Sequence, residues 1–122
     1  MKFKGYCSLY DTNYYDAFIV DKHAFKESDG RKVPVLKDYG LNDPNNVVGY
    51  AIINDTDKGV IAHCVINDDV IINDDTVLDA HITFVKRADN NPVHIVSGKV
   101  KAVYLSTKEY CSLHDSVTIE EE

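Results

Sequence analysis

The sequence predicts a β-rich α+β domain, a single closed or nearly closed antiparallel barrel of about seven strands with one or two short helices. Three observations lead to this prediction. Apolar and polar residues alternate with a period of two in several short segments, clusters of turn residues separate these segments, and helical periodicity is rare. The 122 residues contain no linker, internal repeat or low-complexity tract, so we expect one domain over residues 1–122.

The first half of the chain contains the clearest strand patterns. Asp21 can cap a brief helical turn over residues 23–26, between two of the strands. The loop at residues 55–59 ends in glycine and is typical of a five-residue hairpin connection. Five strands are predicted in this half, at residues 3–10, 17–20, 33–36, 47–54 and 60–67.

The second half is less regular. Residues 68–79 are ambiguous, because the apolar run at residues 70–72 is flanked by paired aspartates, and a short helix over 74–79 remains an alternative. Residues 88–92 form a turn. Strands are expected at residues 80–86, 93–97 and 99–106, with residues 117–119 as a last short one.

The charge balance excludes some classes of partner. Thirteen basic and 20 acidic residues give a net charge of −7, which disfavours binding to nucleic acid or to an anionic membrane surface. No apolar run approaches the roughly 18 residues that span a membrane. The first residues enter a strand pattern at once, so we expect no signal peptide and a cytoplasmic compartment.

We expect neither a cofactor nor a metal ion. The cysteines, Cys7, Cys64 and Cys111, are far apart and odd in number, which predicts three reduced thiols. The chain has no C-x-x-C pair, so structural zinc is not expected. The aspartates at residues 68–75 lack the alternating pattern and closing glutamate of a calcium-binding loop.

Residues 33–51, VPVLKDYGLNDPNNVVGYA, carry a resemblance to a known family. Together with the segments FKGYCSLYD, FIVDKHAFKES and the later KGV and VIND, they resemble the caudoviral prohead (head-maturation) proteases, whose fold is related to herpesvirus assemblin. The resemblance covers most of residues 2–68 and, more loosely, 93–106. It implies a protease-like β fold.

The resemblance also implies that the catalytic positions are degenerate. Two histidines of the family align with Tyr39 and Leu41, and neither side chain can serve as a general base near neutral pH. The family's nucleophile aligns with Ala80, and a later serine aligns with Tyr104. We therefore expect no catalytic residue at these four positions.

A shifted catalytic site is the alternative. One inserted residue near residues 74–75 would change the register of the second half, and a shift by one residue moves a side chain to the other face of a sheet. A rebuilt site would combine a serine with a histidine within hydrogen-bonding distance. The candidates are Ser106 or Ser97 with His81 or His94, of which Ser106 with His81 is the pair we expect to matter if the protein is active.

The resemblance implies a non-catalytic phage head or capsid protein that reuses a protease fold for capsid binding, assembly or decoration. Its expected partners are the major capsid protein or a scaffold protein, with homo-oligomerisation left open, and with no nucleic acid or membrane. It would lie in the host cytoplasm during assembly and then in the virion. The alternatives are an active prohead maturation serine protease that cleaves a scaffold or capsid precursor, and a host-encoded small binding barrel.

Overall fold

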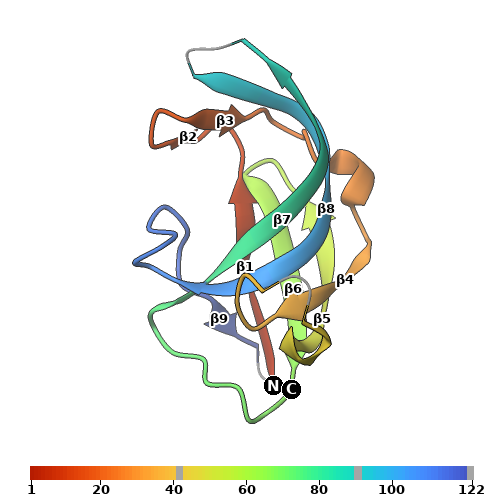
Figure 1. Cartoon of the computed structure of the whole chain (residues 1–122), viewed down its shortest axis with the longest axis vertical. Coiled ribbons are helices and arrows are strands. Elements are labelled where there is room, and N and C mark those ends of the chain that lie inside the picture. Colours follow the sequence, from red (N-terminus) through yellow and green to blue (C-terminus); the bar gives the residue numbers. More distant parts are fainter. Residues whose placement is uncertain (41–42, 90–91, 121–122) are drawn as a thin grey trace.

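The computed structural model of the chain describes residues 1–40, 43–89 and 92–120, and in this part the protein is mostly β (Figure 1). The prediction of a mostly β domain is therefore confirmed. The elements are β1 (Lys2–Leu9), β2 (Asn13–Tyr14), β3 (Phe18–Val20), η1 (Lys26–Ser28), β4 (Lys32–Leu36), η2 (Pro44–Asn46), β5 (Val47–Asp55), β6 (Gly59–Ile66), β7 (Thr76–Ala88), β8 (Val93–Thr107) and β9 (Thr118–Ile119).

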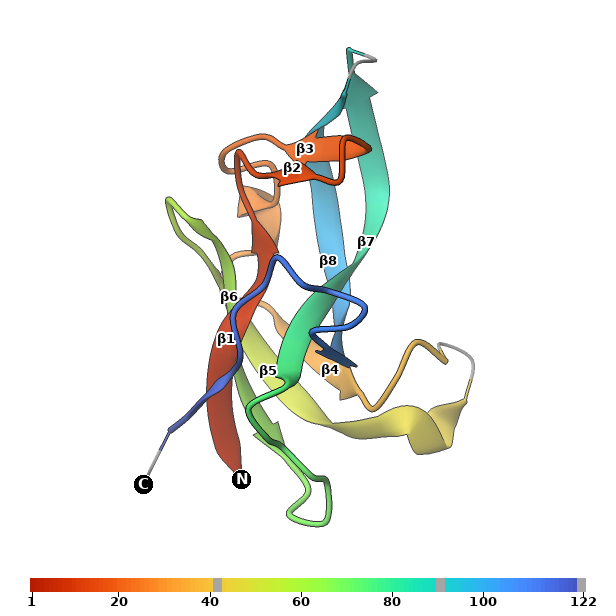
Figure 2. The same cartoon turned by 90° about the vertical axis from the view of Figure 1, so that its left-hand side faces the viewer.

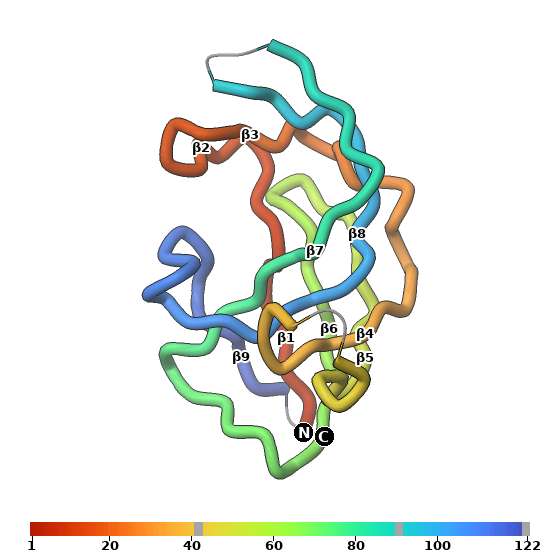
Figure 3. The backbone as a smooth tube through the Cα atoms, in the orientation of Figure 1, coloured from red at the N-terminus to blue at the C-terminus, as the bar shows by residue number. Residues whose placement is uncertain are grey.

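The strands form one strongly curled sheet, an open half-barrel rather than the closed or nearly closed barrel that we predicted (Figure 3). Its order is β2-β3-β8-β4-β5-β6-β1-β9, and β7 pairs with β8 outside this path. β1 and β7 pack against each other, but no hydrogen-bonded ladder joins them among the described residues. The barrel stays open because a loop fills the gap between β1 and β7, which we call the seam. The segment after β8 runs between the two strands (Figure 2).

The sheet is also not purely antiparallel. β8 is antiparallel to β7, but it runs parallel to β3 at one end and to β4 at the other. The predicted strands at 93–97 and 99–106 are in fact one strand, which runs through Gly98 although the register with β7 shifts there. The Gly98 N–H donates to the Ala24 carbonyl at 3.2 Å, and a Cβ at this position would lie 2.9 Å from the Phe25 ring.

The expected helices are reduced to two single 3-10 turns, η1 and η2, in the described residues. The turn predicted over residues 23–26 begins later, at Lys26, and Asp21 does not cap it. His23 has a φ of 61°, which is incompatible with a right-handed helix, and its ring is held by Asp55 at 2.7 Å. The helix considered over 74–79 does not form, because β7 already begins at Thr76.

The core lies on the concave side of the sheet, and it joins both halves of the chain. Phe3, Phe25, Ile53 and Leu78 are fully buried there. The three cysteines are buried and unpaired, as the sequence predicted. Within the described ranges, no helix is long and apolar enough to cross a membrane. The predicted turn at 88–92 lies partly outside the described residues.

Candidate functional site

The site predicted from the sequence lies where β4 ends beside β7 and β8. The Tyr39 hydroxyl oxygen is 3.0 Å from Asp79 Oδ2 and 2.9 Å from Ser106 Oγ. A phenol has a single proton, so when Tyr39 donates to the carboxylate, the Ser106 hydroxyl donates to the phenol oxygen. The three side chains then form one hydrogen-bonded chain from serine to carboxylate.

The strand ladder explains why these residues meet. Asp79 of β7 pairs directly with Tyr104 of β8, and Ser106 lies two residues further along β8, on the same face of the sheet. Tyr39 follows β4, and its ring packs on that of Tyr104 with ring centroids 4.6 Å apart. His81 packs edge-on against the other side of this group, 5.8 Å from the Tyr104 ring. Four of the candidate residues from the sequence, Tyr39, Tyr104, Ser106 and His81, are therefore brought together.

The electrostatics of this group disfavour base catalysis by Tyr39. Burial raises the pKa of Tyr39 from 10.0 to about 12, and the negative charge of Asp79 adds to this effect although the Ser106 hydrogen bond opposes it. Burial and Asp79 also raise the pKa of Tyr104. A protonated phenol cannot accept the serine proton, so Tyr39 cannot act as the general base for Ser106 at neutral pH.

The remaining sequence candidates are not joined by hydrogen bonds into a serine–histidine pair in the described part of the chain. Ala80 lies in β7 against the core and carries no reactive group. His94 Nδ1 lies 2.6 Å from Asp21, and no described hydrogen bond joins this imidazole to Ser97. No imidazole of the described residues is hydrogen-bonded to Ser106 either. Leu41 lies outside the described residues.

A groove of about 710 Å³ opens beside Ser106. Its walls are the connection from β4 to β5, the connection from β6 to β7, and the last residues of β8. Apolar contact comes from Tyr39, Tyr110 and Ile71, the last of which is 83% exposed. The charged residues in its lining are Lys37, Asp38, Asp69 and Asp75, which makes the groove acidic.

Sequence reasoning missed a second cluster, which shares Asp79 with the first. Three side chains, those of Asp79, Cys111 and His114, each place one atom that can bind a metal ion within 4.8 Å of the other two. Cys111 and His114 are buried. The spacing C-x-x-H of Cys111 and His114 was the only indication in the sequence. It was overlooked because a cysteine pair was sought, and because nothing along the chain connects Asp79 with a segment more than thirty residues later.

Comparison with known proteins leaves the chain unassigned, because no family model, no curated protein and no solved structure matches it.

Proposed function

We propose that this chain is a non-catalytic head protein of a tailed phage, which reuses the fold of a prohead protease to bind a capsid or scaffold segment. One observation carries the proposal. The phenol of Tyr39, at the position that the resemblance assigns to a catalytic histidine, is the group that contacts Ser106. A serine therefore lies beside the degenerate position, but its neighbour cannot take its proton at neutral pH.

The groove supports a binding role and indicates the chemistry of the partner. It combines exposed apolar and aromatic surface with three carboxylates and a single lysine. Charge complementarity favours a partner segment that carries lysine or arginine beside apolar residues. An open groove of this kind suits an extended or loop segment of a capsid or scaffold protein better than a small molecule.

The remaining parts of the proposal follow from this role. The partner is the major capsid protein or the scaffold protein, in the host cytoplasm during assembly and in the virion afterwards. The net charge of −7 is consistent with a position away from packaged DNA. Several copies on a symmetric shell would let a modest affinity per site suffice, provided the copies are linked.

Reaction with a fluorophosphonate probe, read by intact mass, tests the absence of catalysis. We expect no adduct on the folded protein, because Tyr39 cannot act as the base for Ser106. The Ser106→Ala variant is the control. Stoichiometric labelling that disappears in this variant would contradict the proposal and establish the alternative, an active maturation protease with a shifted site. That alternative is favoured by one observation, the position of Ser106 in the groove wall.

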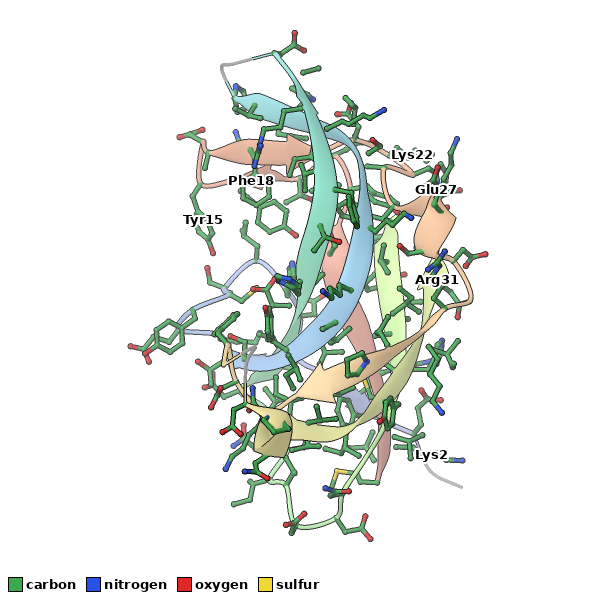
Figure 4. All side chains as sticks on the ribbon, turned by 45° about the vertical axis from the view of Figure 1, so that its right-hand side comes forward. Lys2, Tyr15, Phe18, Lys22, Glu27 and Arg31 are labelled. Atoms are coloured by element: carbon green, nitrogen blue, oxygen red, sulfur yellow. The ribbon has the colours of Figure 1, made fainter. Side chains whose placement is uncertain are left out.

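A binding experiment tests the positive side of the proposal. The chain is immobilised, and the capsid and scaffold proteins encoded by the same genome are passed over it in biolayer interferometry. Asp69→Lys and Asp75→Lys reverse charge in the groove, whereas Glu27→Lys makes the same change on exposed η1, which does not line the groove (Figure 4). We expect the two groove variants to weaken binding at least about tenfold, with Glu27→Lys close to wild type. No binding to either protein, or equal loss in all three variants, would refute the groove as the docking site.

A further inference from the structure

The cluster of Asp79, Cys111 and His114 lies at the seam of the half-barrel, where the segment after β8 meets β7. Asp79 belongs to β7, and the other two residues follow β8. The Cys111 N–H donates to the Thr107 carbonyl, and the His114 N–H is 3.4 Å from the Cys111 carbonyl, so this segment is tightly turned. The turn brings a thiol, an imidazole and a carboxylate together from two elements of the fold.

The imidazole of His114 is already oriented as in many metal sites. Its Nδ1 donates to the Leu78 carbonyl at 2.6 Å, an arrangement that places the lone pair on Nε2. Nε2 accepts from the Tyr14 hydroxyl, also at 2.6 Å. Asp79 likewise has an outer partner, because Oδ2 accepts from Tyr39 at 3.0 Å. Two of the three ligand side chains are thus held by groups outside the cluster.

The charge and the space around the cluster point to a cation. Asp79 is only partly exposed, and no lysine, arginine or histidine of the described residues forms an ion pair with it. Its negative charge is therefore available to a cation. Asp79 and Cys111 also line a cavity of about 180 Å³ between β7 and the β2–β3 hairpin. Figure 4 shows Tyr15 and Phe18 on the hairpin side of this opening.

We propose that Asp79, Cys111 and His114 bind a divalent zinc ion, with the fourth position open to the cavity. Thiolate, imidazole and carboxylate together match the ligand preferences of zinc, and three protein ligands leave one place for water. In a tetrahedral site neighbouring ligand atoms are roughly 3.3–3.6 Å apart. The separations of up to 4.8 Å would therefore contract by up to roughly 1.5 Å, through side-chain rotations.

Binding would release the thiol proton of Cys111 to solvent. The ion would also bind the lone pair of His114 Nε2, in place of the hydrogen bond that the Tyr14 hydroxyl now donates to it. The ion would link β7 to the segment after β8, and so it would fasten the loop that fills the open seam. This inference does not depend on the proposed function. An ion that fastens this loop would serve a binding protein and a protease equally.

Cobalt(II) titration of chelator-treated protein tests the site directly. A cysteine thiolate bound to cobalt gives a charge-transfer band in the near ultraviolet, and we expect this band to saturate at one equivalent. Zinc should displace the cobalt and raise the melting temperature, since an ion that binds only the folded state stabilises it. A folded protein that gives no thiolate band, or that shows no saturation at one equivalent, would overturn the proposal.

Variants assign the ligands. Cys111→Ser should abolish the charge-transfer band, whereas Cys64→Ser, which alters a buried thiol outside the cluster, should keep it. His114→Asn should weaken cobalt binding more than about tenfold. Tyr14→Phe removes the competing hydroxyl, so it should leave the affinity unchanged or higher. A band that persists in Cys111→Ser, or an affinity that falls in Tyr14→Phe, would contradict this assignment.

Discussion

The hydrogen-bonded chain from Ser106 through Tyr39 to Asp79 can be tested by removing one oxygen atom, that of the Tyr39 hydroxyl. Tyr39→Phe removes the hydroxyl, but it keeps the ring that packs on Tyr104. Hydrogen bonds to charged groups contribute about 1.5–3 kcal/mol when buried. Because Tyr39 is 46% exposed, water replaces part of this loss, and we expect the free energy of unfolding to fall by about 1 kcal/mol.

Urea denaturation of four proteins measures this effect: wild type, Tyr39→Phe, Ser106→Ala and the double variant. The coupling energy between the two substitutions should be about 0.5 kcal/mol, as expected for residues that share one network. Tyr39→Ala should cost about 1 kcal/mol more than Tyr39→Phe, since it also removes the aromatic contact. If Tyr39→Phe is as stable as the wild type and the coupling is zero, the network has no energetic role, and our explanation of the site is wrong.

The same network predicts a pH dependence with a definite sign. The pKa of Tyr39 is raised in the folded state, from 10.0 to about 12, so folding favours the protonated phenol. Its contribution to stability is fully present below pH 10, and it is lost as the pH rises toward 12. The unfolding free energy of Tyr39→Phe should therefore decline less steeply than that of the wild type over this interval. Parallel curves would contradict the assignment.

Three further predictions concern the rest of the fold. Leu78→Ala, at a fully buried position, should lower the free energy of unfolding by about 3–5 kcal/mol in urea denaturation, and a loss below about 1 kcal/mol would show that the core is poorly packed there. Gly49→Ala should prevent stable folding, because a Cβ would lie 2.1 Å from a carbonyl oxygen of β6. In Gly30→Ala the new Cβ meets no atom within 4 Å, so this variant should lose only about 1–2 kcal/mol of unfolding free energy, owing to its φ of 78°. Equal circular dichroism melting curves for the two variants would refute this contrast. The hydrogen bond that the His94 Nδ1–H donates to Asp21 raises the pKa of His94, so this pair contributes stability below the ordinary pKa of 6.5 that is lost as the pH rises through the folded value. Asp21→Asn should lower the His94 pKa in an NMR titration, and an unchanged value would exclude the pair as its cause.

Local patterns were sufficient to predict most strands. Alternation located β1, and the glycine-ended loop located the β5–β6 hairpin, although its connection is residues 56–58 rather than the predicted 55–59. The pattern could not predict that β8 is one long strand, since the ring that packs at Gly98 belongs to Phe25, more than seventy residues earlier. It also could not predict whether the barrel closes, because closure depends on whether a ladder or a loop fills the seam between β1 and β7.

The candidate site, too, could be predicted only in part from the sequence. The resemblance led to Tyr39 and Tyr104, and the structure brings both beside Ser106 and His81. Asp79 was not singled out, although it contacts Tyr39 and belongs to the second cluster. Aspartates are common in this chain, and only the cross-strand pairing with Tyr104 distinguishes this one from the solvated aspartates around it.

The place of β8 in the sheet has a consequence for synthesis of the chain. β8 pairs with β3 at one end and with β4 at the other, two strands that leave the ribosome more than fifty residues earlier. Until residues 93–107 emerge, each of those strands has an edge without its final neighbour. Meanwhile β1, β4, β5 and β6 can assemble through antiparallel pairs, and β2 can pair with β3. Because contacts between distant segments form slowly, the nascent chain should spend most of its synthesis as a partial sheet, and it should depend on chaperones more than its small size suggests.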